Sequence, residues 1–112
     1  MAKILLVEDE MLVRELAFED LLDAGHDVTV AGSGDEALGI LRGDQGFEVL
    51  FTDIRMPGEL DGWQLAEQAR GLIPGLKIIF ATGLNDDAGW KKPEDRMLAK
   101  PYRKDDLLNA LA

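Results

Sequence analysis

Residues 3–10 read KILLVEDE, a short apolar run that ends abruptly in three acids. A continuous apolar run of this length predicts a strand that is buried on both faces of a sheet. The following stretch, Glu10–Ala24, carries apolar residues at roughly helical spacing, and Gly25 stands where a helix would end. The chain therefore opens with a buried strand and a helix.

The same alternation of strand and helix continues along the rest of the chain. Ser33 and Glu36 form the pattern of a capping box, and Asp61 with Gln64 forms a second helix start. Short apolar or β-branched runs between these starts predict further strands. Strands are expected at Asp27–Ala31, Phe47–Thr52, Leu76–Ala81 and Glu94–Ala99, and helices are expected after Ser33, after Asp61 and over Arg103–Leu111.

Alternating strands and helices predict an α/β fold with right-handed crossovers and a parallel sheet that is covered on both faces. Five strands in 112 residues suit a doubly wound, flavodoxin-like three-layer sandwich with strand order 2-1-3-4-5. Residues 82–92 hold glycines and acids without helical periodicity, so the helix of that connection is expected to be shortened or missing. The functional crevice of such a sheet lies at the carboxyl ends of strands 1 and 3.

The net charge and the residue composition exclude several classes of binding partner and of metal site. The chain has 22 acids against 12 lysines and arginines, a net charge of −10. This charge argues against nucleic acid or an anionic membrane as a direct partner, because both are negatively charged. No apolar run could span a bilayer or serve as a signal peptide, and there is no cysteine for a disulfide or a thiolate metal site. We expect one domain, residues 1–112, in the cytoplasm.

Polar residues stand at the expected carboxyl ends of four strands. Glu8 and Asp9 follow the first strand, Asp53 the third, Thr82 the fourth and Lys100 the fifth. Because strands 1 and 3 are neighbours, the three acids should crowd together and face Thr82 and Lys100. Two carboxylates about 4 Å apart repel by roughly 4 kcal/mol at an effective dielectric near 20. A divalent cation would remove this cost, and an all-oxygen ligand set favours Mg²⁺.

Together these groups predict a receptor for a phosphoryl group. Asp53 offers a nucleophilic carboxylate, Lys100 a positive charge and Thr82 a hydroxyl. Taken singly, each residue has a structural interpretation, such as a carboxylate that ends a strand or acids that favour the start of a helix. The functional interpretation therefore depends on their convergence at one rim.

Five short motifs carry a resemblance to a known family over the whole chain. They are LLVEDE at residues 5–10, TDIRMP at 52–57, Asp61-Gly62, ATG at 81–83 and KPY at 100–102. In this order, each near a strand end, they resemble the receiver domain of response regulators in two-component signalling. The resemblance implies that Asp53 is phosphorylated by a histidine kinase or a histidine phosphotransfer protein. It also implies a signal passed to a downstream protein, without catalytic turnover beyond the domain's own phosphotransfer and slow dephosphorylation.

The resemblance also implies which residues bind Mg²⁺ and which two residues, Thr82 and Lys100, act on the phosphate. Mg²⁺ would be bound by Asp9, Asp53 and the backbone carbonyl of Arg55, with Glu8 acting mainly through water. Thr82 would move towards the phosphate after transfer. Lys100 would contact the phosphate, and the peptide bond after it, to Pro101, is expected to be cis.

Two features depart from the usual pattern of the family. Met97 occupies the position of the aromatic residue that commonly acts as a rotamer switch, and the segment from Thr82 to Lys100 is shorter than usual. The FATG sequence at residues 80–83 resembles single-domain receivers that lack this aromatic, and the Pro57–Asp61 loop resembles receivers of sensor kinases. Our hypothesis is that the output runs through the Gly83–Lys92 loop together with Thr82.

Three other functions compete with the phosphoacceptor. An unphosphorylated pseudo-receiver would act as an interaction or dimerisation module, although the full set of pocket residues argues against it. A phosphatase with an aspartyl-phosphate intermediate usually has a second acid two residues after the nucleophile, where this chain has Arg55. A flavin-binding module would place a phosphate beside acids that repel it.

Overall fold

The computed structural model describes residues 2–83 and 91–112. Strands and helices alternate as far as the fourth strand, and the last strand leads into a final helix. The elements are β1 (Lys3–Val7), α1 (Met11–Asp23), β2 (Asp27–Ala31), α2 (Gly34–Gly43), β3 (Val49–Asp53), α3 (Gly62–Leu72), β4 (Lys77–Thr82), β5 (Arg96–Ala99) and α4 (Lys104–Leu111).

The five strands form one sheet in the order β2-β1-β3-β4-β5, and every neighbouring pair is parallel. The neighbouring strands β1 and β3 are the most enclosed: all of β3 is buried, and β1 is buried from Ile4 onwards. This is expected where helices cover both faces of a parallel sheet. The predicted doubly wound sheet and its strand order are confirmed.

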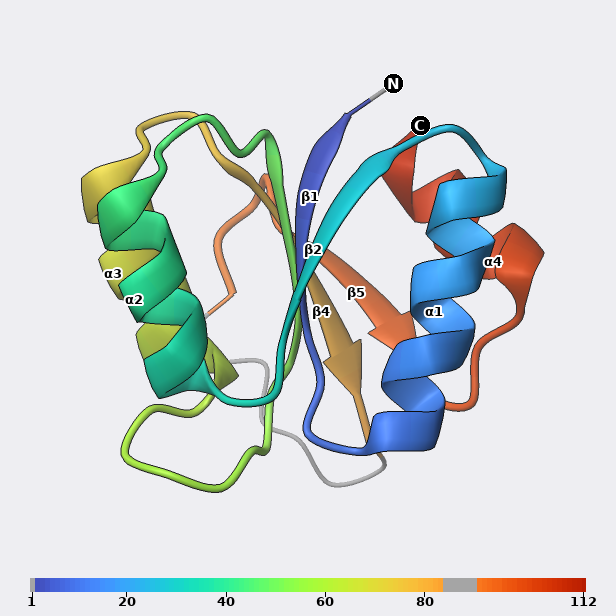
Figure 1. The fold of residues 1–112 in the computed structure, drawn as a ribbon, viewed down its shortest axis with the longest axis horizontal. Helices are drawn as coiled ribbons and strands as arrows, with labels where there is room; N and C mark the ends of the chain where they lie inside the picture. The colour runs from blue at the N-terminus through green and yellow to red at the C-terminus, as the bar shows by residue number, and fades with distance from the viewer. Residues whose placement is uncertain (1, 84–90) are drawn as a thin grey trace.

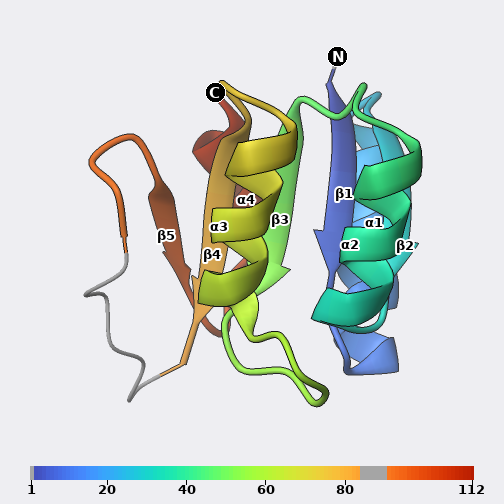
Figure 2. The same cartoon turned by 90° about the vertical axis from the view of Figure 1, so that its left-hand side faces the viewer.

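Helices α2 and α3 cover one face of the sheet, and α1 and α4 cover the other (Figures 1 and 2). Successive strand residues point to opposite faces, so the core divides into two clusters. Leu50 and Phe80 belong to the cluster on the side of α2 and α3, whereas Phe51 belongs to the cluster on the side of α1 and α4. Phe51 also meets the ring of Tyr102 edge-on, with centroids 5.7 Å apart.

The predicted helix caps are present. The Ser33 side chain accepts a hydrogen bond from the Glu36 backbone N–H at 3.1 Å, which opens α2. Asp61 and Gln64 exchange reciprocal bonds of 2.9 and 3.0 Å at the start of α3. Gly25 has a φ of 90°, a left-handed conformation that favours glycine after a helix end. Local sequence therefore sets where these helices begin and end.

The connection between β4 and β5 differs from a regular strand–helix unit. Residue 83 and residues 91–95, the described parts of this connection, contain no helix. Residues 84–90 lie outside the described range. Most of the segment in which a shortened or missing helix was expected, and most of the Gly83–Lys92 loop to which the output was assigned, therefore lie outside it too. Among residues 2–83 and 91–112, no helix has the length and apolar character needed to cross a membrane.

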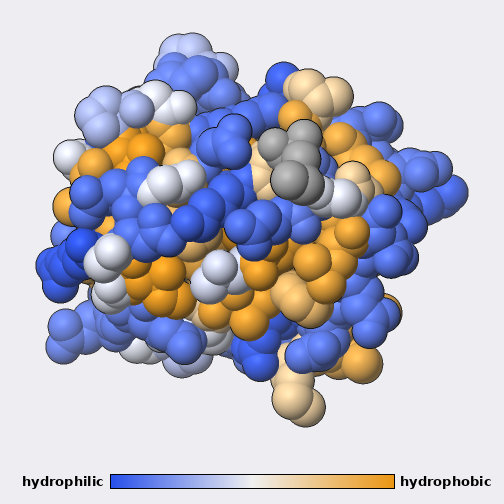
Figure 3. All heavy atoms as spheres, turned by 45° about the horizontal axis from the view of Figure 1, so that its top comes forward, coloured by the Kyte–Doolittle hydropathy of each residue, from blue (hydrophilic) through white to orange (hydrophobic). Residues whose placement is uncertain are grey.

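The amino ends of the strands lie opposite the predicted site. Figure 3 brings this end of the molecule forward and shows hydrophilic residues over much of its surface, with apolar residues in patches between them. The carboxyl ends of the strands gather at the other end, at the bottom of Figure 1.

Candidate functional site

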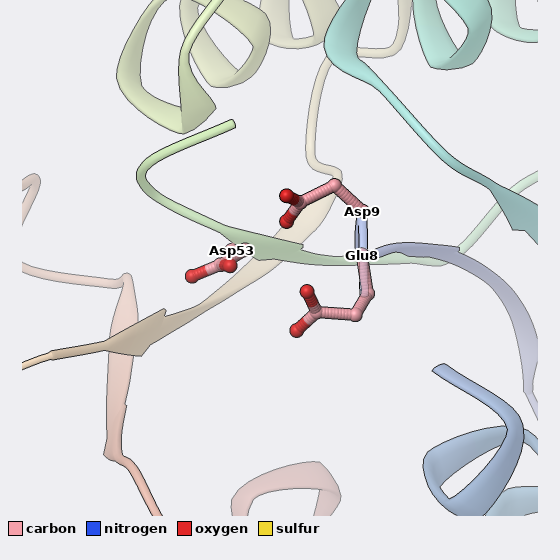
Figure 4. A group of neighbouring side chains, drawn as sticks. All are labelled: Glu8, Asp9 and Asp53. Atoms are coloured by element: carbon pink, nitrogen blue, oxygen red, sulfur yellow. The ribbon is translucent and has the colours of Figure 1, made fainter. Parts of the chain in front are cut away.

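The three predicted acids meet at the carboxyl ends of β1 and β3. In the β1–β3 register Val7 lies opposite Thr52, so the next residues, Glu8 and Asp53, leave the sheet side by side. Carboxylate oxygens of Glu8, Asp9 and Asp53 all lie within 4.8 Å of one another. Figure 4 shows the carboxyl groups of Glu8 and Asp9 on the side that faces Asp53. The crowding expected from the strand order is therefore present.

Lys100 places one amine between two of these acids. Its Nζ donates to Asp53 Oδ2 at 2.8 Å and to Glu8 Oε1 at 3.1 Å. Its backbone N–H donates to the carbonyl of Thr82 at 2.9 Å, which ties the end of β5 to the end of β4. The peptide bond from Lys100 to Pro101 is cis, as the family resemblance implied.

Backbone N–H groups hold the remaining oxygens of the two buried acids. Asp53 Oδ1 accepts from the Ile54 N–H at 3.0 Å, and Glu8 Oε2 accepts from the Glu10 N–H at 3.1 Å. Only 8% of Asp53 and 3% of Glu8 is exposed. Both side chains are thus fixed in direction, and both contact Lys100 directly.

The pKa values reflect this enclosure. Burial raises the pKa of Asp53 and that of Glu8, while the hydrogen bond from Lys100 opposes the rise in each. Burial by itself would lower the pKa of Lys100, but its bonds to Asp53 and Glu8 outweigh that effect and raise it. The carboxylates therefore carry charge at a cost that one amine does not fully offset.

Thr82 and Arg55 occupy the same end of the sheet. Asp53 lies opposite Ala81 in the β3–β4 register, so Thr82 stands one residue beyond the level of the phosphoacceptor candidate. Thr82 is half-buried at the last position of β4. Arg55 is exposed in the loop that follows β3. The positions agree with those predicted, whereas the roles of both residues stay predictions.

The donor set suits a hard divalent cation. Within the described part of the chain, Glu8, Asp9 and Asp53 form a group of side chains that could hold a metal ion. All three contribute carboxylate oxygens, the ligands that Mg²⁺ and Ca²⁺ prefer, and none contributes nitrogen or sulfur. The residues present therefore fit Mg²⁺.

Two supporting residues were not predicted. Arg14 Nη1 donates to the Glu8 carbonyl at 2.9 Å, which brings a guanidinium beside the acids. Thr52 Oγ1 donates to the Asp53 carbonyl at 2.8 Å from a fully buried position. Arg14 lies in the first turns of α1, where a positive charge is unfavourable because of the helix dipole. This unfavourable position was the sequence signal that could have pointed to a role for Arg14. Thr52 gave no comparable indication.

Comparison with known proteins agrees with this geometry. The model of the response regulator receiver domain family matches residues 4–112. The chain belongs to this receiver family. The receiver is 39% identical over 117 residues to the response regulator receiver protein CpdR of Brucella abortus (strain 2308), covering 99% of this chain and 94% of that protein.

A segment of a longer protein and a solved structure are also similar to this chain. The receiver is 40% identical over 88 residues to the sensor kinase CckA of Brucella abortus (strain 2308), which covers 78% of this chain but only 9% of the kinase. The crystal structure of a response regulator receiver protein from Sinorhizobium medicae WSM419 matches with a TM-score of 0.90 and 32% identity. That match covers 97% of this chain and 90% of the other. The receiver is thus a module of two-component signalling with the flavodoxin-like fold.

Proposed function

We propose that this receiver accepts a phosphoryl group on Asp53 from a phosphohistidine of a histidine kinase or a histidine phosphotransfer protein. The observation that carries the proposal is the position of the Asp53 carboxylate, between the acids that follow β1 and the amine of Lys100. The phosphorylated receiver then signals to a protein partner in the cytoplasm, without acting as a turnover enzyme.

The transfer moves one phosphoryl group between two nucleophiles. A carboxylate oxygen of Asp53 forms a bond to phosphorus while the bond from phosphorus to the donor imidazole nitrogen breaks, and that nitrogen takes a proton from solvent. The hydrogen bond from Ile54 N–H to Oδ1 orients the carboxylate before attack. Such transfers depend on positioning and on neutralising charge rather than on covalent help from other groups.

The surrounding residues supply the positive charge and the donors. Glu8, Asp9, Asp53 and the backbone carbonyl of Arg55 would hold Mg²⁺, which when bound neutralises negative charge on the carboxylates and the phosphoryl oxygens. Lys100 would turn from the Asp53 carboxylate to the new phosphoryl group. The hydroxyl of Thr82, at the end of the neighbouring strand, would donate to a phosphoryl oxygen.

Intact mass after incubation with acetyl phosphate and Mg²⁺ tests the proposal. The wild-type chain should gain one phosphoryl group that is labile to base and to hydroxylamine. Asp53→Asn should gain none, because the amide is a poor nucleophile. Asp44→Asn is the matched control, since Asp44 lies on the surface in a pair with Lys3, and it should be phosphorylated like wild type.

Other outcomes would point to other functions. No gain of mass on wild type, with Mg²⁺ bound, would favour the alternative of an unphosphorylated interaction or dimerisation module. Repeated hydrolysis of a phosphate ester by wild type would favour a phosphatase. Equal labelling of wild type and Asp53→Asn would contradict Asp53 as the acceptor.

A further inference from the structure

Gly62, the first residue of α3, lies directly against the backbone of the phosphoacceptor candidate. A Cβ at this position would stand 2.2 Å from the Asp53 carbonyl oxygen and 2.7 Å from Ile54 Cα. Ordinary van der Waals contact begins near 3.4 Å, and both neighbours are backbone atoms that no rotamer change can move away. Any side chain here must therefore separate α3 from Asp53 by about 1 Å.

Hydrogen bonds also join these residues. The Gly62 N–H donates to the Ile54 carbonyl at 2.6 Å, and the Ile54 N–H donates to Asp53 Oδ1 at 3.0 Å. Thr52 Oγ1 donates to the Asp53 carbonyl at 2.8 Å. The start of α3 is thus connected through one residue, Ile54, to the carboxylate itself, so a shift of α3 would move that carboxylate.

A second glycine holds the loop after Asp53 from the side of α2. A Cβ at Gly34 would stand 2.7 Å from the carbonyl oxygen of Leu60 and 2.9 Å from its Cβ. The next residue, Asp35, accepts a hydrogen bond from the Glu59 N–H at 3.3 Å. The loop of residues 54–61, which carries Arg55, is therefore held between the first turns of two helices.

We propose that Gly62 and Gly34 are positioning residues of the phosphoacceptor site. Gly62 sets the place of Asp53 by letting α3 approach its backbone, and Gly34 sets the place of the loop that carries Arg55. The effect on phosphorylation rests on the proposed function, whereas the effect on geometry does not. Phosphoryl transfer requires alignment of the reacting atoms, and a displacement of about 1 Å can slow such a reaction roughly a hundredfold.

The same two helices contain matched controls. Gly71 in α3 and Gly39 in α2 have nothing within 4 Å of an added Cβ. Alanine at these positions should leave the site unchanged, and it favours the helix over glycine. Gly62→Ala and Gly71→Ala therefore form one pair, and Gly34→Ala and Gly39→Ala the other, in the complete chain.

Three measurements on folded protein test the proposal: the rate of phosphorylation by acetyl phosphate at saturating Mg²⁺, the Mg²⁺ affinity by calorimetry, and the NMR position of the Ile54 amide. Gly62→Ala should slow phosphorylation roughly a hundredfold and Gly34→Ala about tenfold, with weaker Mg²⁺ binding in both. The Ile54 amide should shift in Gly62→Ala. The two control variants should stay within about twofold of wild type, as expected for open sites.

A folded Gly62→Ala with the rate, the Mg²⁺ affinity and the Ile54 amide of wild type would overturn the proposal. If Gly62→Ala does not fold, Gly34→Ala decides it by the same measurements, because its contact is milder and acts on the same loop. Failure of wild type to take up phosphate would count against the proposed function only. In that case the Ile54 amide and the Mg²⁺ titration still decide whether these glycines position the site.

Discussion

Two buried carboxylate sites lie at opposite ends of the sheet and are balanced in different ways. At the amino end of β5, Asp95 accepts from the guanidinium of Arg70 and from the Lys92 N–H at 2.9 Å. At the carboxyl ends of β1 and β3, the buried carboxylates of Glu8 and Asp53 share the amine of Lys100, and the exposed Asp9 lies beside them. The first site has a guanidinium and a backbone N–H for one buried acid, whereas at the second site two buried acids share one amine.

This difference separates a structural site from a binding site. A buried acid with a full set of donors needs nothing further, and removing its partner leaves an uncompensated charge. A group of acids with too little positive charge nearby destabilises the folded state, and binding of a cation to that state can offset the destabilisation. Our proposal that this end of the sheet is the functional one rests on the excess of carboxylate at the ends of β1 and β3 rather than on burial alone.

Arg70→Met should have the largest effect and would break the balanced site. It leaves the Asp95 carboxylate buried without its guanidinium, so the free energy of unfolding should fall by about 3 kcal/mol. Urea denaturation measures this. Lys104→Met is the control: Lys104 and its partner Asp23 both lie on the surface, with 46% and 71% of their side chains exposed, so the loss should stay below about 1 kcal/mol. Equal losses in the two variants would contradict the structural role of the Arg70–Asp95 pair.

Mg²⁺ should act only on the unbalanced site. At a free concentration ten times the dissociation constant, it should raise the free energy of unfolding of wild type by about 1.4 kcal/mol. Arg70→Met should gain as much as wild type, whereas Asp53→Asn should gain little because a ligand is lost. Thermal unfolding with and without Mg²⁺ provides the measurement. A gain in Asp53→Asn as large as in wild type would place the metal elsewhere.

When Mg²⁺ is absent, replacing Asp by Asn should change the free energy of unfolding in opposite directions at the two sites. Asp53→Asn removes one charge from a crowded group, so the protein should become about 1 kcal/mol more stable. Asp95→Asn removes the charge that matches Arg70, so the protein should become less stable. Urea denaturation of both variants in a chelating buffer tests this pair. A loss of stability in Asp53→Asn would show that Lys100 already balances the acids.

The smallest expected effect is the pH dependence of the extra stability of Asp53→Asn. Burial raises the pKa of Asp53 above its ordinary value of 3.8, so the folded state binds a proton more readily than the unfolded chain. Ionised Asp53 therefore lowers stability above the raised pKa, and this penalty disappears as the pH falls towards 3.8. The advantage of Asp53→Asn should accordingly be full at neutral pH and decline by at most about 1 kcal/mol in acid. An advantage that grows on acidification would contradict the raised pKa.

Much of the fold followed from local patterns. The apolar run of β1, the caps at Ser33 and Asp61 and the glycine after α1 are short-range features. The predicted strands are present with boundaries that differ from the prediction by at most two residues. Asp53, for example, was expected just after the third strand and is its last residue. Boundaries moved because the ladder with neighbouring strands, not local sequence, determines where pairing stops.

At the candidate site, the gathering of the acids and Lys100 at one edge of the sheet also followed from sequence, because parallel strands bring their carboxyl ends together. Its internal contacts did not. The bond from Lys100 to Glu8, the contact of Arg14 with the Glu8 carbonyl and the close approach of Gly62 to Asp53 join residues from different elements. No periodicity or motif specifies which of several nearby groups a long side chain will reach.

The amino-acid sequence by itself determined the order of strands and helices, the helix starts and the set of acids at the strand ends, since these depend on neighbouring residues and on chain topology. Only the tertiary structure decided which acids are buried, how one amine is shared between them and how closely α3 approaches Asp53. The physical reason is that burial, pKa and steric contact depend on distances of a few ångströms between distant parts of the chain, and packing of the two helical layers on the sheet sets those distances.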